Sequence, residues 1–343
     1  MSLPNRPDGI WQDWTAAAER LDRRFAGLYQ LCSFDYRQPL RLQQGVPRRL
    51  RRPYTTPVAY ADWGPRDAPI LICCGGVANT AMRFSFLAAD LSRHPAGAWR
   101  VIAPDWLGRG QSGWLADECE YARDTYVEQL RQLIAHLGGG PMALLGSSMG
   151  GSVGIALAAS DPSLVSRLIL NDVGPHIPRA RRLKRANTLA RHYVFRSPAD
   201  IMRRVGASHK NDGPVPDDIR LFLAWHQTRW SNENAGRVYR LDPRALQAYR
   251  ADAQQAVDQW QAWRQLSCPL LVLHGMQSDA LLAPTLRRMQ KTQDMTLVHI
   301  PQTGHTPVLF DRNQTGLLGN WLAAGGREAV ELSLPLAWPR QPW

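Results

Sequence analysis

The sequence predicts an α/β fold with a mostly parallel central sheet, helices on both faces and an inserted helical cap. Three observations lead to this prediction. Apolar runs alternate with amphipathic stretches from residue 58 onward, 44% of the 343 residues are hydrophobic, and the stretch 175–266 is too long to be a simple connection. The chain can therefore bury a large core, and the alternation favours parallel strands joined by helices.

The predicted strands are short apolar runs, bounded by polar or glycine-rich segments. The run 70–74 is apolar throughout, which is typical of a strand that is buried on both faces of a sheet, whereas 58–62 is expected to be an edge strand. The expected strands cover residues 58–62, 70–74, 99–103, 142–145, 168–171, 270–274 and 297–300. Active sites of such sheets gather at the carboxyl ends of the strands, so we examined the loops that follow them.

The predicted helices lie between these strands. In 121–137 the residues Tyr126, Leu130 and Leu133 recur at the spacing of one helical face. Further helices are expected at 84–92, directly after residue 150 and at 314–322. The resulting division is an N-terminal extension at 1–55, a core at 56–174 and 267–325, a helical cap at 175–266 and a tail at 326–343.

The segment Gly146-Ser147-Ser148-Met149-Gly150 has the pattern G-x-S-x-G. An apolar strand precedes it and an apolar, glycine-containing helix follows it. This setting is typical of a nucleophile elbow, in which small residues let the chain turn sharply and present a serine. The sequence therefore predicts Ser148 as a nucleophile rather than as a solvated turn residue.

A nucleophilic serine needs a general base, and the base needs a carboxylate that orients it. Asp279 follows the strand 270–274, and His305 follows the strand 297–300. We therefore predict a triad of Ser148, His305 and Asp279. Asp172 also follows a strand, and it remains an alternative carboxylate.

The chain resembles the α/β-hydrolase superfamily over about residues 55–325, and it is most similar to the cap-bearing bacterial serine esterase-like branch. The order Ser148, Asp279, His305 agrees with the order in that superfamily. The resemblance rests on the runs 104–112, 146–150, 170–175 and 304–305. It implies a hydrolase that works through an acyl-enzyme and needs no cofactor.

The resemblance also implies an oxyanion hole made of two backbone N–H groups. Met149, directly after the nucleophile, is one expected donor. The family usually has His-Gly after the strand that carries the other donor, whereas this chain has Cys74-Gly75-Gly76-Val77. A backbone donor does not need the histidine. Gly76 is the predicted donor, and Val77 is the alternative.

The reaction predicted from these residues is hydrolysis of carboxylic esters with a mainly apolar acyl group, in a pocket covered by the tryptophan-rich cap. C–C bond hydrolysis, as in meta-cleavage product hydrolases, and acyl-CoA thioester hydrolysis remain alternatives within the enzymes. A non-catalytic hydrolase-like binding protein is a third possibility, and the complete Ser/Asp/His set argues against it. Ser148 also argues against haloalkane dehalogenases and epoxide hydrolases, whose similar elbows carry aspartate.

Charge and motifs narrow the classes of ligand. Lys and Arg number 41 against 29 Asp and Glu, which gives a net charge of +12 and favours anionic partners. No zinc finger or nucleic-acid-binding motif is present, so the expected partner is a small-molecule ester and not nucleic acid. The nine histidines show no metal-binding spacing, and no phosphate-binding loop follows Gly75-Gly76. Neither a metal nor a cofactor is expected.

Cysteine usage and the chain ends favour a cytoplasmic protein. The five cysteines contain no C-x-x-C pair. Cys73 and Cys74 lie in an apolar run and Cys268 precedes another, which suggests buried reduced thiols. The first residues lack an apolar signal region, and no uncharged run approaches the length of a membrane span.

Two basic segments lie outside these motifs. In residues 1–55 the apolar residues Trp11, Trp14, Leu21, Phe25 and Leu28 recur at helical spacing, before a cluster of arginines at 37–52. A second basic run, at 179–185, opens the cap. Packing of the first helix on the core is the simpler interpretation. The alternative is peripheral contact of residues 1–52 with an anionic surface, such as a membrane or a storage granule.

Overall fold

The computed structural model describes residues 9–189, 193–208, 213–326 and 331–334. The expectations about the first eight residues and about most of the C-terminal tail fall outside these ranges. None of the described helices combines the length and hydropathy needed to cross a bilayer.

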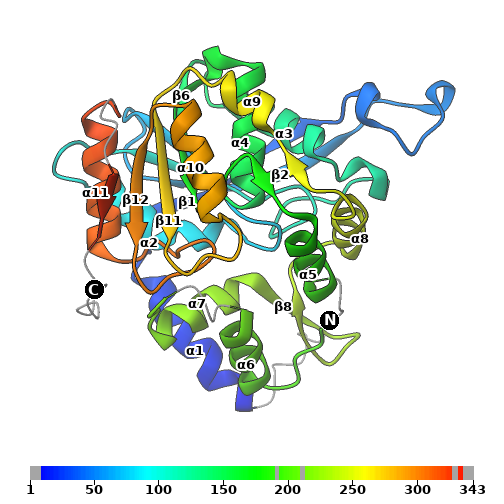
Figure 1. The fold of residues 1–343 in the computed structure, drawn as a ribbon. Helices are drawn as coiled ribbons and strands as arrows, with labels where there is room; N and C mark the ends of the chain where they lie inside the picture. Colours follow the sequence, from blue (N-terminus) through cyan, green and yellow to red (C-terminus); the bar gives the residue numbers. More distant parts are fainter. Residues whose placement is uncertain (1–8, 190–192, 209–212, 327–330, 335–343) are drawn as a thin grey trace.

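A nine-stranded sheet forms the centre of the molecule (Figure 1), with the strand order β1-β2-β4-β3-β5-β6-β11-β12-β13. β1 pairs with β2 and β2 with β4 in antiparallel fashion, and the other neighbours are parallel. The strands are β1 (Tyr29–Arg37), β2 (Thr55–Trp63), β3 (Ile70–Cys74), β4 (Arg100–Pro104), β5 (Met142–Ser147), β6 (Val165–Asn171), β11 (Leu270–Gly275), β12 (Thr296–Ile300) and β13 (Glu331–Ser333).

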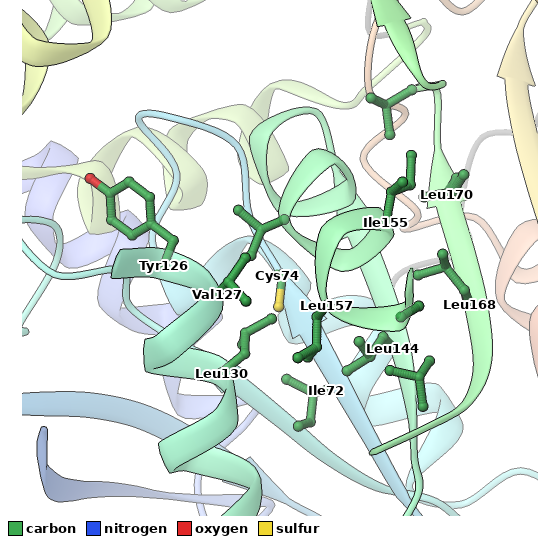
Figure 2. Close-up of a cluster of buried hydrophobic side chains, with 14 of the residues drawn as sticks. Ile72, Cys74, Tyr126, Val127, Leu130, Leu144, Ile155, Leu157, Leu168 and Leu170 are labelled. Atoms are coloured by element: carbon green, nitrogen blue, oxygen red, sulfur yellow. The ribbon is translucent and has the colours of Figure 1, made fainter. Parts of the chain in front are cut away.

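The apolar runs of the strands serve two cores, one on each face of the sheet. In β3, Ile72 packs on one face while Leu71 packs on the other. This alternation follows from the period of two in a strand, and it explains why these strands are apolar throughout. Figure 2 shows the core on one face, where β3, β5 and β6 meet side chains of α3 (Arg123–His136) and α4 (Met149–Ser160).

Helices cover both faces, as expected for this fold class. The face with α3 and α4 is also covered by α9 and α10, and the other face by α2, α11, α1 and α7. The bounds are α1 (Gly9–Arg23), α2 (Ser85–Leu91), α7 (Asp217–Gln227), α9 (Trp260–Arg264), α10 (Ala283–Thr292) and α11 (Arg312–Ala323).

The residues between β6 and β11 form helices and short strands, of which α7 and α9 pack on the faces of the sheet. In Figure 1 the arrowheads of β11 and β12 point toward α5, α6 and α7, which lie beyond that end of the sheet. The remaining elements are α5 (Arg179–Leu189), α6 (Pro198–Ser208) and α8 (Pro243–Asp252), the hairpin of β8 (Thr228–Ser231) and β9 (Gly236–Tyr239), and the pair of β7 (His176–Ile177) and β10 (Val257–Asp258).

The N-terminal segment is more closely joined to the core than its predicted boundary at residue 55 implies. β1 lies before that boundary and is an edge strand of the main sheet. The apolar face of α1 is buried against α7, and Trp11 makes edge-to-face contacts with Trp14 and Trp230. The residues between β1 and β2 form an arm that extends from the body in Figure 1.

Candidate active site

The nucleophile elbow lies between β5 and α4, where the sequence predicts it. Ser148 has φ 51° and ψ −113°, a conformation that non-glycine residues rarely adopt. The two flanking glycines are required sterically. A Cβ on Gly146 would lie 2.4 Å from Cα of Gly151, and a Cβ on Gly150 would lie 2.3 Å from the carbonyl oxygen of Cys74. The G-x-S-x-G pattern is therefore what lets this turn form against β3.

His305 lies in the loop after β12 and contacts a buried carboxylate. Its Nδ1 is 3.0 Å from Oδ2 of Asp172. A carboxylate accepts hydrogen bonds only, so Nδ1 carries the proton and Nε2 is left to accept one. Asp172 is fully buried directly after β6, where its Oδ1 accepts from the N–H of Gly275 and its Oδ2 accepts from Oγ of Ser278. Three contacts to two loops thus fix the carboxylate and, through it, the imidazole.

Asp279 lies elsewhere, which corrects the predicted pairing. Its side chain is 43% exposed, and its Oδ1 accepts from Nε of Arg181 at 2.9 Å. The physical reason is the length of the loop. Asp172 directly follows its strand, whereas Asp279 lies four residues beyond the end of β11 and has reached the surface beside α5. The structure therefore gives His305 the carboxylate that the sequence left as an alternative.

Asn171 connects the elbow with the loop that carries His305. Its Nδ2 donates to Oγ of Ser147 and to the carbonyl oxygen of Pro307, both at 2.9 Å. Asn171 is the last residue of β6, and it is buried. The side chain of Asn171 thus links the elbow that carries Ser148 to the loop that carries His305.

The glycine-rich loop after β3 faces the elbow. A Cβ on Gly76 would lie 3.5 Å from Cβ of Ser148. The N–H of Gly76 already donates to Oδ1 of Asn79 at 2.9 Å, so it is not available to a ligand. For the N–H of Val77 the described residues provide no acceptor. The geometry therefore differs from the prediction of Gly76 as the donor and favours the alternative, Val77.

Two side chains from the loop after β4 hold this glycine-rich loop. Nε1 of Trp106 donates to the carbonyl oxygen of Gly75 at 2.8 Å, and Nε of Arg109 donates to that of Val77 at 3.1 Å. Both side chains are buried. The loop after β4 is itself organised by Asp105, whose carboxylate accepts from the N–H groups of Ala81 and Gln111. Burial raises the pKa of Asp105 to about 6, although these two hydrogen bonds oppose the shift.

A cavity of about 340 Å³ begins at the elbow and runs between α3, α4 and α8. Ser148, Met149 and Val77 line it, so the serine and both candidate oxyanion donors border the same space. Such a volume is at the low end of the range for ligand pockets. Apolar and charged residues both contribute, and the charged ones are Arg109, Glu118, Arg123, Arg182 and Asp252.

The cap tryptophans do not line this cavity, in contrast to the expected tryptophan-rich cover. Trp260 and Trp263 belong to the core on the α4 face of the sheet. Trp225 and Trp230 pack with α1 in a separate cluster. Within the described residues, α8 covers the cavity instead, through alanines and Tyr249. The tryptophans pack the cap against the core and against α1, and their abundance in the sequence was not a sign of an apolar binding site.

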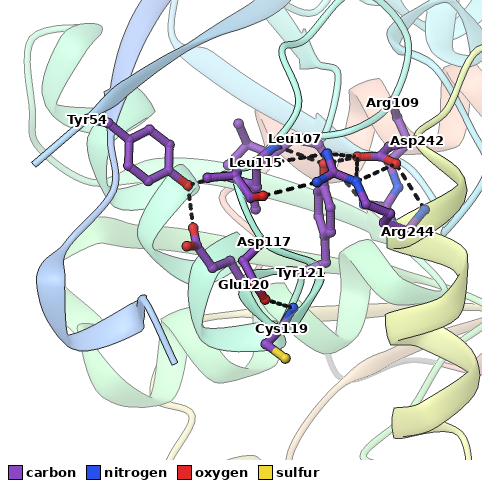
Figure 3. A network of polar contacts seen from close by, with 11 residues as sticks. Tyr54, Leu107, Arg109, Leu115, Asp117, Cys119, Glu120, Tyr121, Asp242 and Arg244 are labelled. Atoms are coloured by element: carbon purple, nitrogen blue, oxygen red, sulfur yellow. Dashed lines mark hydrogen bonds and ion pairs between the residues drawn. The ribbon is translucent and has the colours of Figure 1, made fainter. Parts of the chain in front are cut away.

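Figure 3 shows how α8 is fixed over the cavity. Asp242 is fully buried at the N-terminus of α8, and its Oδ2 accepts from Oη of Tyr121 and from Nη2 of Arg244, both at 2.7 Å. The guanidinium of Arg244 also reaches the carbonyl oxygens of Leu115 and Ala116. Its hydrogen bonds to Asp242 raise the pKa of Arg244. The network joins the cap to the loop that forms the mouth of the cavity.

Sequence reasoning missed the residues that shape the cavity. Arg123, Tyr126 and Asp252 carry no motif, and a helical pattern alone does not say which of its residues meet the cap. For Asp172 a signal was present, because it directly follows the strand next to the nucleophile strand. Within the described residues, no group of three or more His, Cys, Asp or Glu is placed to hold a metal ion.

Comparison with known proteins identifies the fold family. A family model described as the alpha/beta hydrolase fold matches residues 68–311. The 3-hydroxybutyrate-oligomer hydrolase of Cupriavidus necator is 30% identical over 271 residues, which are 76% of this chain and 90% of that protein. Lipase LipV of Mycobacterium tuberculosis is 31% identical over 157 residues, which are 45% of this chain and 57% of that protein.

Among solved structures, an α/β hydrolase from Novosphingobium aromaticivorans is similar, with a TM-score of 0.72 and 25% identity, over 87% of this chain and 98% of that chain. The family model covers well over half of the sequence. The elbow, the parallel strands from β3 to β12 and the histidine loop all lie within the matched region. The chain therefore belongs to the α/β-hydrolase fold family, and it is a hydrolase.

Proposed function

We propose that this protein hydrolyses carboxylic esters through Ser148, His305 and Asp172. The observation that carries the proposal is the contact of His305 with the buried Asp172. Asn171 joins the loop of His305 to the elbow, where Ser148 is held on a strained turn and lines a cavity. In this arrangement Asp172 orients the imidazole, and Nε2 of His305 is the base for Ser148.

The reaction would proceed in two steps. Oγ of Ser148 attacks the ester carbonyl while His305 takes its proton. The N–H groups of Val77 and Met149 stabilise the oxyanion, and each such donor is worth about 3–4 kcal/mol in the transition state. The ester C–O bond then breaks, and His305 returns the proton to the leaving alkoxide. A water activated by His305 cleaves the acyl-enzyme and restores Ser148.

The proposed substrates are short oligoesters of small hydroxy acids. The support is the relative from Cupriavidus necator, whose name assigns it to 3-hydroxybutyrate oligomers and which matches this chain over 90% of its own length. The cavity agrees with a short substrate, because about 340 Å³ accommodates a small ligand and not a polymer segment.

The test is labelling and turnover by purified protein. A fluorophosphonate probe should label Ser148, and the 3-hydroxybutyrate dimer and p-nitrophenyl butyrate should both be hydrolysed. Ser148→Ala should lose labelling and lower kcat on the order of 10⁶-fold. Ser160→Ala, an exposed serine at the end of the same helix, is the matched control and should be fully active.

Two outcomes would contradict the proposal. An unlabelled Ser148 and no turnover would favour a non-catalytic binding protein. Labelling without ester turnover would instead direct the search to thioester or C–C substrates, which the same triad can serve.

A further inference from the structure

The charged lining of the cavity carries more positive than negative charge. Three guanidinium groups, those of Arg109, Arg123 and Arg182, border it together with the two carboxylates of Glu118 and Asp252. Glu118 is exposed at the surface, where solvent screens its charge. The cavity thus has an excess of one positive charge in a partly desolvated setting, which favours an anionic ligand.

Two of the three arginines already have partners. Arg109 is buried and donates to the carbonyl oxygens of Val77 and Leu107 and to Oη of Tyr126. Arg182 is buried and pairs with the carboxylate of Asp252. Its Nη1 also donates to the carbonyl oxygens of Asp252, the last residue of α8, and of Gln255. These two side chains serve the oxyanion loop and the cap, and they have little capacity left for a ligand.

Arg123 differs from both. It is the first residue of α3 and is partly buried, and within the described residues no hydrogen-bond acceptor or ion pair is found for its guanidinium. Burial lowers its pKa, and nearby Arg182 acts in the same direction, whereas Asp252 and Asp124 oppose the shift. Asp252 is engaged by Arg182, and Asp124 is exposed.

A guanidinium without an acceptor in a cavity is costly, because it has lost part of its hydration and gained no hydrogen bond in return. An anion in the cavity would remove that cost. A carboxylate fits best, since its two oxygens match the two parallel N–H groups of a guanidinium.

We infer that Arg123 binds a free carboxylate of the substrate, so that the enzyme prefers esters that carry one. This inference rests on the proposed function. Two kinds of ester share this chemistry. In an oligoester of a hydroxy acid the free carboxylate belongs to the leaving alcohol, and in a half-ester of a dicarboxylic acid it belongs to the acyl group.

The experiment compares charged and neutral substrates in matched variants. The substrates are the 3-hydroxybutyrate dimer as free acid, its methyl ester, monomethyl glutarate as the half-ester, and p-nitrophenyl butyrate. Arg123→Gln removes the charge. The control is Arg250→Gln, an exposed arginine of α8 that does not line the cavity.

Wild-type protein should prefer the free-acid dimer or the half-ester over the neutral esters. Arg123→Gln should lower kcat/KM for the preferred acid on the order of tenfold to a hundredfold, mainly through KM, and leave p-nitrophenyl butyrate within about twofold. Arg123→Lys should recover part of the loss. Whether the dimer or the half-ester is the preferred acid tells which side of the ester carries the carboxylate.

A loss of equal size on charged and neutral esters would show that Arg123 is only structural, and it would overturn the inference. Wild-type turnover that does not distinguish free acid from methyl ester would overturn it as well. Both results leave the proposed function intact, because hydrolysis of p-nitrophenyl butyrate and labelling of Ser148 report on that separately.

Discussion

The position of Asp172 follows from its backbone as much as from its side chain. Its φ is 53°, a left-handed conformation that aspartate tolerates better than most residues. The N–H of Asp172 donates to the carbonyl oxygen of Leu273 in the neighbouring strand at 2.8 Å. The turn therefore directs the carboxylate across the end of β11, where it accepts from Gly275 and contacts His305.

The two aspartates give a matched pair of variants. Asp172→Asn should lower kcat about 10⁴-fold, because an amide can hold the imidazole in the wrong tautomer. Asp279→Asn should retain activity within a few-fold, since it removes an ion pair with Arg181 at the surface. Steady-state kinetics on p-nitrophenyl butyrate would measure both. A larger loss in Asp279→Asn than in Asp172→Asn would restore the assignment that the sequence suggested.

Asp105 contributes to the pH dependence of stability. Its pKa is raised by burial from the ordinary 3.8 to about 6, so the folded state binds more protons than the unfolded state between about pH 4 and 6. The free energy of unfolding therefore falls as the pH rises through this window, and the contribution is constant above it. A shift of about two units corresponds to about 3 kcal/mol.

Asp105→Asn should reduce the fall of the free energy of unfolding between about pH 4 and 6. Urea unfolding at pH 4.5, 5.5 and 6.5 would compare the variant with wild type, and Asp67→Asn, an exposed aspartate, is the control. The variant is expected to be less stable at pH 6.5, where the ionised carboxylate accepts from both Ala81 and Gln111 and an amide cannot. An unchanged pH slope in Asp105→Asn would refute the raised pKa.

At the scale of elements, α8 depends on a single carboxylate. Asp242 caps the N-terminus of the helix, where Oδ1 accepts from the N–H of Arg244 at 2.9 Å. The same carboxylate binds the Arg244 side chain and Tyr121, so cap helix and cavity mouth share one buried charge (Figure 3). Removing one partner of such a buried ion pair leaves the charge of the other partner without a counter-charge.

Asp242→Asn should therefore destabilise the protein by about 3–5 kcal/mol if unfolding is two-state, and it should raise KM more than it lowers kcat. Loosening α8 changes the walls of the cavity and leaves the triad in place. Asp217→Asn, an exposed aspartate at the start of α7, is the control. Urea unfolding and kinetics would measure the two effects. A stable variant with an unchanged KM would mean that α8 is held by its apolar contacts alone.

The elements that the sequence predicted well are those with strong local signals. β3 has the bounds that were expected, and β5, β6, β11 and β12 extend the predicted runs by at most three residues. Consecutive apolar residues and a glycine-framed turn are local properties, so they can be read from the chain. The buried helix after the elbow follows from the same reasoning.

The elements that were missed depend on distant partners. β1 alternates exposed and buried residues only because β2 lies beside it, and β13 pairs with β12 at the far edge of the sheet. For a similar reason, the sequence could not decide whether Asp172 or Asp279 is the carboxylate that contacts His305. β6 and β11 are neighbours in the sheet, so both following loops end near His305, and the sequence does not say which side chain reaches it.

At the scale of the whole molecule, the N-terminal arm between β1 and β2 is a basic segment that the fold leaves largely unburied. The apolar face of α1 is covered by α7, so this face cannot contact a membrane or granule surface. The arm, residues 38–54, contains no acidic residue. Leu40 and Leu50 are 47% and 55% exposed, and Arg48, Arg49 and Arg52 are exposed as well.

We propose that this arm, and not α1, makes the peripheral contact with an anionic surface, for which we take a phospholipid bilayer. Basic residues near an anionic surface contribute about 1 kcal/mol each, and exposed leucines add apolar contact. The arm borders the mouth of the cavity, because a Cβ on Gly45 would overlap the carboxylate of Asp117, next to Glu118 of the cavity lining. Docking of the arm would therefore bring the cavity close to the bilayer.

Wild-type protein should co-sediment with phosphatidylglycerol vesicles at low salt, and much less with phosphatidylcholine vesicles or at high salt. The triple change of Arg48, Arg49 and Arg52 to Gln should weaken this binding on the order of a hundredfold, because it removes about 3 kcal/mol of attraction. The matched control is the same change at Arg20, Arg23 and Arg24, which are exposed around the end of α1. Equal loss in both triples would mean that net charge alone drives binding, and no vesicle binding by wild type would leave the arm without this role.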